Sequence, residues 1–122
     1  MTIKQALDLA EELRPNELSA DLKLHWLSQL DGELQTNLFD RFEGSPDPIG
    51  PYDAQTDPDT VLLVDWPYDD IYVRFLVMCI DLANGDLDRY NNDAVYFNRI
   101  LHSYTAFYAH NRLPKAAAAL RF

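Results

Sequence analysis

The organisation of this chain is decided by residues 42–73, which read FEGSPDPIGPYDAQTDPDTVLLVDWPYDDIYV. These 32 residues contain eight acids, no Lys or Arg, and five of the seven prolines in the chain. The stretch is predicted to pack poorly on itself, because its charges repel one another and proline lacks an amide donor. Strongly helical sequence lies on both sides. We therefore expect an all-α, four-helix domain with a long acidic, Pro-rich loop, at about residues 44–65, between helices 2 and 3.

Two helices are expected before this stretch. Thr2 and Gln5 have the spacing of a capping box, and apolar residues at helical spacing follow them. Ser19 or Asp21 is suited to cap the second helix. This helix is predicted to be long and to end at Gly44, because one apolar stripe lasts for five turns. The stripe consists of Leu24, Leu27, Leu30, Leu34, Leu38 and Phe42.

Two further helices are expected after it. Residues 71–83 are apolar almost all round, which predicts a central helix with Pro67 in its first turn and a stop at Gly85. Residues 61–64 form either a brief strand or the point where the loop docks back onto the core. The fourth helix is predicted to end before Pro114 and to carry a seam for packing along another helix. The seam residues are Ala94, Phe97, Leu101, Tyr104 and Tyr108.

Length and charge bound the classes of protein to consider. A chain of 122 residues is expected to form one domain, residues 1–114, followed by a C-terminal tail at 115–122. Its net charge of −10 disfavours sequence-specific nucleic acid and anionic membrane surfaces as partners. The longest apolar run is shorter than the ~20 residues of a membrane span, so a soluble protein is expected. The single cysteine, Cys79, is expected to pack among apolar neighbours, and its isolation fits a reducing cytoplasm.

Residues that carry chemistry are sparse. His25, His102 and His110 do not form a metal-binding motif, and the acids near Asp86 lack the glycine and glutamate of a calcium loop. Helix capping is the favoured interpretation of those acids. We expect no enzymatic activity, no catalytic residue, no cofactor and no metal. A metal-assisted hydrolase that uses Asp86, Asp88 or the histidines is kept as a hypothesis, after the two that are given below.

The aromatic residues are more informative than the acids. Ten of the fifteen lie between Trp66 and Tyr108. Neighbours such as Tyr96 and Phe97 point in different directions on one helix, so some aromatic surface is expected outside, where Tyr and Trp often anchor interfaces. Ordinary amphipathic packing is an equal alternative. The candidates for packing and subunit contact are Tyr68, Tyr72, Tyr96, Tyr104 and Tyr108, and those for a loop that meets a partner or lumen are Asp53, Asp57 and Asp59.

Several segments resemble one family. KLHWLSQLDG (23–32), PYDDIY (67–72), IDLANG (80–85) and YNN (90–92) are similar to segments of small prophage proteins of Gram-positive bacteria, which look like the phage head–tail connector, or neck adaptor, group. The resemblance covers about residues 1–112, and Asp93 stands where a serine is usual. It implies a mainly helical protein that assembles as a ring beneath the portal, around a channel for DNA.

The functional expectation follows from that resemblance. It is a non-enzymatic structural protein whose partners are further copies of itself, in a homo-oligomeric ring, and portal or tail proteins. It would be present in the host cytoplasm during assembly and then in the virion neck. The alternative is an acidic interaction or inhibitor protein that binds a basic partner.

Overall fold

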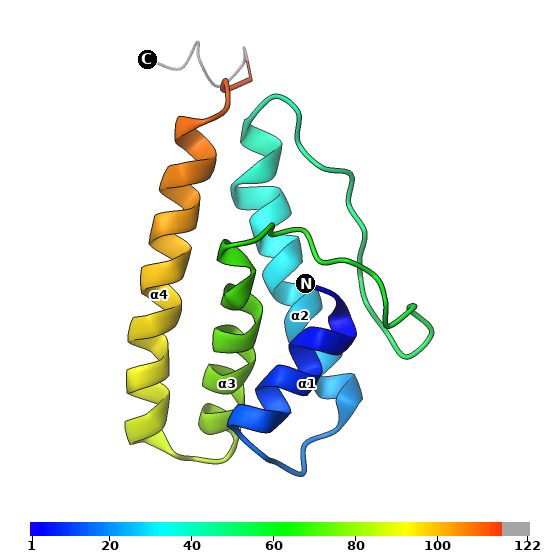
Figure 1. Cartoon of the computed structure of the whole chain (residues 1–122), viewed down its shortest axis with the longest axis vertical. Helices are drawn as coiled ribbons and strands as arrows, with labels where there is room; N and C mark the ends of the chain where they lie inside the picture. The colour runs from blue at the N-terminus through cyan, green and yellow to red at the C-terminus, as the bar shows by residue number, and fades with distance from the viewer. Residues whose placement is uncertain (116–122) are drawn as a thin grey trace.

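The computed structural model describes residues 1–115 and contains four α-helices (Figure 1). They are α1 (Ile3–Leu13), α2 (Ala20–Asn37), α3 (Ile71–Ala83) and α4 (Leu87–His110). There are also two short 3-10 helices: η1 (Phe39–Arg41) lies between α2 and the loop, and η2 (Tyr68–Asp70) lies between the loop and α3. Within the described residues there is no strand, so the all-α prediction is confirmed. The expected tail at 115–122 lies outside the described residues except for Lys115.

At the start of α1, the start of α2 and the end of α3, the local signals act as predicted. The Thr2 hydroxyl accepts from the amide of Gln5 at 3.1 Å, and the Gln5 side chain accepts from the amide of Thr2 at 2.9 Å, which completes the capping box. Ser19, and not Asp21, caps α2 by accepting from the amide of Leu22. At the junction of α3 and α4, Gly85 has a φ of +74°, a conformation that glycine adopts without the steric penalty of a side chain.

Helix α3 is the centre of the fold. It packs against α1, α2 and α4, and Figure 1 shows it between α4 on one side and α1 and α2 on the other. A helix with neighbours on several sides needs apolar residues around most of its circumference, which explains the near-continuous apolar run. Its buried residues are Ile71, Tyr72, Val73, Leu76, Val77, Ile80 and Asp81.

Helix α2 ends earlier than its apolar stripe predicts. The α-helix stops at Asn37, and the chain tightens into η1 rather than continuing to Gly44. A 3-10 turn has about three residues per turn, so the change moves the apolar face. Phe39 is therefore fully buried, whereas Phe42, which the stripe assigns to the core, is only half-buried.

The loop between η1 and η2 returns to the core at residues 61–64. Val61 makes only an isolated bridge with Thr2, while Leu62 and Val64 are buried. Of the two structures considered for this run, docking onto the core is therefore the one that the chain adopts. No helix of the described residues is both long enough and apolar enough to cross a membrane.

Candidate interaction surface

The acidic loop is fastened to the helices by one buried carboxylate. Asp31 on α2 accepts hydrogen bonds from the hydroxyl of Tyr52 in the loop, at 2.5 Å, and from the hydroxyl of Tyr72 on α3, at 2.6 Å. The Tyr72 hydroxyl also accepts from the amide of Val64 at 2.8 Å. Burial raises the pKa of both tyrosines, and the nearby Asp31 raises it further, so both remain protonated donors.

The Asp31 carboxyl itself is under opposed influences. Burial raises its pKa, while the hydrogen bonds from Tyr52, Tyr72 and the amide of Leu63 lower it. A buried carboxyl with several donors holds its neighbours in fixed positions, because an unpaired polar group there is costly. The clamp formed by Asp31, Tyr52 and Tyr72 therefore orders the loop. Sequence composition predicts that the loop packs poorly on itself, and in the structure it is held by contacts to the helices.

The start of α1 holds the same loop at a second point. The amides of Ile3 and Lys4 donate to the carbonyl oxygens of Thr60 and Pro58, each at 3.0 Å. The first amides of a helix have no partner within the helix, so loop carbonyls satisfy them here. The amide of Leu62 in turn donates to the carbonyl of Met1 at 2.9 Å. The loop is thus tied to α1, α2 and α3.

The three candidate aspartates of the loop lie on the surface between these anchors. Asp53, Asp57 and Asp59 are all exposed. A carboxylate oxygen of Asp53 accepts from the amide of Gln55 at 2.8 Å, and one of Asp57 accepts from the amide of Asp59 at 2.9 Å. Such local bonds fix a turn. The loop therefore presents its carboxylates on ordered backbone.

The five candidate tyrosines divide into two groups. Tyr72, Tyr104 and Tyr108 are buried, because the bundle itself covers their rings, so in the single chain they serve the predicted packing. Tyr68 is half-buried, and Tyr96 is 53% exposed. Tyr104 and Tyr108 belong to an aromatic cluster with Phe39, whose ring centroid lies 6.3 Å from that of Tyr104 and 4.9 Å from that of Tyr108.

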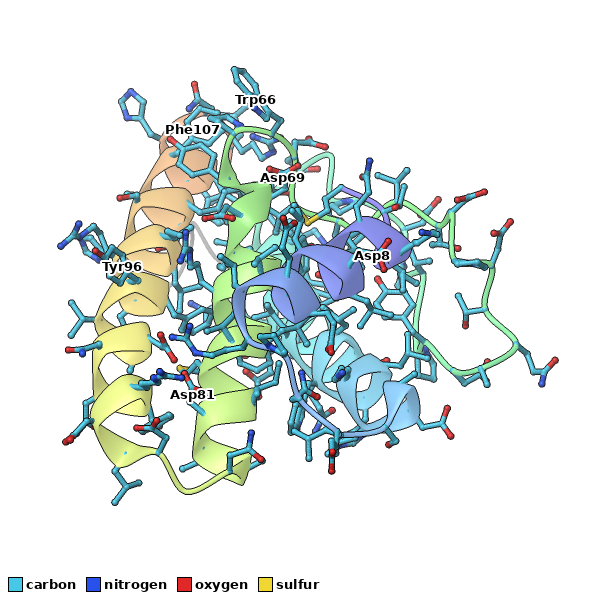
Figure 2. All side chains as sticks on the ribbon, turned by 60° about the horizontal axis from the view of Figure 1, so that its bottom comes forward. Asp8, Trp66, Asp69, Asp81, Tyr96 and Phe107 are labelled. Atoms are coloured by element: carbon cyan, nitrogen blue, oxygen red, sulfur yellow. The ribbon has the colours of Figure 1, made fainter. Side chains whose placement is uncertain are left out.

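The exposed aromatic side chains lie on and beside α4. Trp66 is 83% exposed, and Phe107 is 44% exposed and stacks on Tyr68 with ring centroids 5.1 Å apart. Figure 2 shows Trp66 and Phe107 near the end of α4 and Tyr96 further along its outer side. Exposed aromatic rings are expensive to hydrate and are frequent in interface centres. Neither Trp66 nor Phe107 is among the contact residues predicted from the sequence.

Two arginines flank the exposed ring of Tyr96. The guanidinium of Arg74 on α3 lies 5.7 Å from the ring centroid, and that of Arg99 on α4 lies 5.5 Å from it. Arg74 also forms an ion pair with Asp70 at 3.0 Å, whereas Arg99 has no ion pair among the described residues. We call Arg74, Tyr96 and Arg99 the basic patch. It stands out on a chain of net charge −10.

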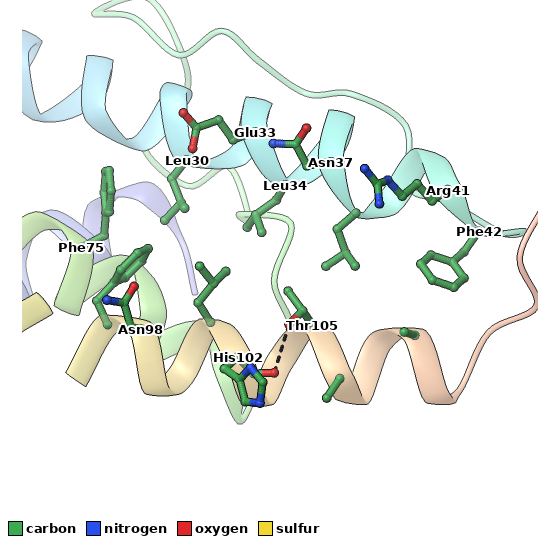
Figure 3. A pocket seen from close by; sticks show the side chains of 15 residues that line it. Leu30, Glu33, Leu34, Asn37, Arg41, Phe42, Phe75, Asn98, His102 and Thr105 are labelled. Atoms are coloured by element: carbon green, nitrogen blue, oxygen red, sulfur yellow. Dashed lines mark hydrogen bonds between the residues drawn. The ribbon is translucent and has the colours of Figure 1, made fainter. Parts of the chain in front are cut away.

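A groove of about 720 Å³ runs between α2 and α4 (Figure 3). Its wall is mostly apolar, with Leu30 and Leu34 from α2, Phe75 from α3 and Leu101 from α4. Glu33 and Arg41 are at the α2 side and His102 is at the α4 side, as Figure 3 shows. Apolar grooves between helices commonly receive small apolar ligands or further helices.

A second charged cluster joins the end of α1 to α3 and α4. Arg14 donates to both carboxylate oxygens of Asp81, at 3.1 and 2.9 Å, and to Asp93 at 3.4 Å. Burial together with the adjacent Asp81 raises the pKa of Asp93 to about 7, with Arg14 and Arg74 acting against the rise. The cluster therefore joins the end of α1 to α3 and α4, and its Asp93 carboxyl is readily protonated.

The remaining candidate residues occupy structural positions. Asp86 caps α4 by accepting from the amide of Arg89 at 3.1 Å, as the capping interpretation predicts. Cys79 is half-buried, and burial raises the pKa of its thiol to about 12, so it is a weak nucleophile at neutral pH. No group of three or more His, Cys, Asp or Glu residues suited to a metal ion occurs in residues 1–115.

Comparisons with protein-family models, with curated proteins and with solved structures found no match to this chain.

Proposed function

We propose that this chain is a non-enzymatic structural protein of a phage or prophage, a head–tail connector or neck adaptor that forms a ring with portal or tail components. It would assemble in the host cytoplasm and reside in the virion neck. The resemblance of its helix starts and turns to that group supports the proposal. The acidic, Pro-rich loop between helices 2 and 3 would be the part that meets a neighbour or faces the channel.

One arrangement carries the proposal. Exposed aromatic and basic residues lie along α4, at one edge of the molecule, and the acidic loop lies at the other edge. A ring needs two different surfaces on each subunit, because each copy contacts its two neighbours through unlike faces. The clamp at Asp31 keeps the loop in a fixed position relative to the helices, which favours a defined contact.

The fluorescence of Trp66 offers a direct test. The chain has two tryptophans, so Trp26→Phe leaves Trp66 as the only one. With 83% of its surface exposed, Trp66 is expected to emit as a solvated indole in the free protein and to shift to the blue when copies or portal subunits cover it. Light scattering on the same samples reports the mass of the assembly.

A pair of matched variants separates contact from folding. Trp66→Ser and Phe107→Ser are expected to keep the helical circular dichroism and to reduce assembly, whereas Leu13→Ser, exposed on α1, is expected to leave assembly unchanged. A chain that remains monomeric at every concentration, with portal protein present as well, argues strongly against a connector.

The second candidate function is that of an acidic interaction or inhibitor protein that binds the basic surface of a partner protein. Mimicry of a polyanion requires carboxylates at fixed positions, and the turns at Asp53 and Asp57 supply ordered backbone for them. Capture of a basic protein that weakens steeply with salt, and is lost in Asp53→Asn/Asp57→Asn/Asp59→Asn, would favour this function. The same variant is not expected to disturb the fold, because the three side chains are exposed.

A further inference from the structure

The basic patch is built to receive carboxylates. Its two guanidiniums lie over the Tyr96 ring, Arg74 at 5.7 Å and Arg99 at 5.5 Å from the centroid, and a guanidinium held in this way keeps N–H groups for hydrogen bonds. Arg74 already donates through Nε to Asp70. Arg99 is exposed and has no acidic partner among residues 1–115. The planar fork of an arginine matches a carboxylate with two parallel hydrogen bonds. A segment of protein that presents exposed carboxylates is therefore an occupant that fits this patch.

The acidic loop has the properties of that occupant. Asp53 and Asp57 each use a carboxylate oxygen for a bond to the backbone of the loop, and their side chains are exposed. Tyr52, directly before them, is buried and bonded to Asp31, so the loop is ordered before it meets anything. Prior order lowers the entropic cost of association.

The two surfaces do not meet within one chain. Helix α4 lies at one edge of the molecule and the loop at the other in both Figure 1 and Figure 2, and the second view is turned about the horizontal axis, which preserves that separation. Because the loop and the basic patch lie at opposite edges, the loop of one copy can pair only with the patch of another copy. A pair of copies formed in this way still has one free patch and one free loop. The result is a head-to-tail series.

We propose that the acidic loop of one copy, through Asp57 and Asp59, docks on the Arg74–Tyr96–Arg99 patch of the next copy. This contact rests on the proposed function, for which it names the subunit interface. It is an ionic contact between exposed groups, so its affinity falls as salt rises.

The test uses two blocked variants of the full chain. Arg99→Glu keeps the loop and blocks the patch, and Asp57→Lys/Asp59→Lys keeps the patch and blocks the loop. Each variant alone is expected to self-associate about tenfold or more weakly than the wild type at low salt, because like charges then face each other. Mixed one to one, they should associate again, because the loop of each variant then carries the charge opposite to that of the patch on the other.

Control variants account for net charge. Arg89→Glu makes the same charge change at the start of α4, and Glu12→Lys/Glu17→Lys makes the same change as the loop variant on other exposed acids. Both are expected to associate like the wild type. Equal weakening in the controls, or a mixture that associates no better than either variant alone, overturns the docking contact.

The outcomes distinguish this contact from the proposed function. If the wild type assembles and the blocked variants assemble equally well, the contact is wrong and the connector proposal stands. If the wild type stays monomeric at low salt and high concentration, the contact between copies is wrong, and the experiment with portal protein then decides the connector proposal.

Discussion

The hydroxyl of Tyr72 on α3 donates a hydrogen bond to Asp31 on α2 across 2.6 Å, in a fully buried position. This bond joins two helices, and the same hydroxyl accepts from the loop amide of Val64. A chain whose middle segment is rich in acids and prolines thus holds that segment in part through one carboxylate that lies outside it.

Removal of the Tyr72 hydroxyl should destabilise the whole fold. Tyr72→Phe leaves the amide of Val64 without its acceptor and Asp31 without one donor, so we expect the free energy of unfolding to fall by about 2–3 kcal/mol. Tyr52→Phe removes one bond at a less buried ring and should cost about 1–2 kcal/mol. Urea unfolding measures both, with Tyr90→Phe at the start of α4 as control. Losses no larger than that of the control would show that the clamp contributes nothing.

The raised pKa of Asp93 predicts a pH dependence of stability. Its pKa is about 7 in the folded protein and about 3.9 in an unfolded chain, so between these values the folded state holds a proton that the unfolded state has lost. Stability from this group is complete below about pH 4, falls as the pH rises, and is lost above about pH 7. The charged groups that act on Asp93 are Arg14 at the end of α1 and Arg74 and Asp81 on α3.

Asp93→Asn should remove that dependence. The amide still accepts from Arg14 and donates to Asp81, and it carries no charge at any pH. Between about pH 5 and pH 8 the loss of unfolding free energy should be smaller in the variant by on the order of 1–2 kcal/mol, a figure reduced for contact with solvent. Asp88→Asn on the exposed start of α4 is the control. An unchanged pH profile in Asp93→Asn would mean that Asp93 is ionised throughout.

Phe39 should be among the most costly side chains to truncate. It is fully buried in η1 and packs on Tyr104 and Tyr108 of α4, with ring centroids 6.3 and 4.9 Å away. Phe39→Ala is expected to lower the free energy of unfolding by about 3–5 kcal/mol, because it leaves a cavity between η1 and α4. Phe107→Ala, at a half-exposed ring, should cost about 1 kcal/mol or less. Comparable losses by thermal or urea unfolding would contradict this assignment of the core.

Two glycines with open surroundings should respond in opposite directions. A Cβ added at Gly32 or at Gly85 meets no atom within 4 Å, so space does not distinguish them. Gly85 has a φ of +74°, and Gly85→Ala should destabilise by about 1–2 kcal/mol. Gly32 lies inside α2, where Gly32→Ala should stabilise by about 0.5–1 kcal/mol. Melting temperatures that move in the same direction would show that the backbone angle is not the deciding factor.

The parts of the fold that follow from local sequence were predictable. The capping box at Thr2, the cap at Ser19 and the turn at Gly85 each depend on residues within a few positions of one another. The end of α2 was not predictable in this way. Its apolar stripe continues past Asn37, whereas the chain tightens there and packs Phe39 against Tyr108 of α4, a long-range contact that the stripe does not indicate.

The candidate surface was predictable only in part. Helical spacing correctly indicates that Tyr96 faces outward and Phe97 inward. A polar residue whose hydrogen-bond partners are distant in the sequence leaves no such pattern. Asp31 therefore reads as an ordinary helical acid of α2, and its role could not be predicted. Trp66 was missed as well, since a large apolar side chain is more often buried than 83% exposed.

The fastening of one irregular segment at several places also has a mechanical meaning. A pull on the tip between Tyr52 and Thr60 reaches α2 and α3 through the buried carboxylate and reaches α1 through the amides of Ile3 and Lys4. A pull on this tip is therefore carried by bonds to three helices and not by bonds to one. A subunit that is gripped by this segment would transmit strain to its whole helical body.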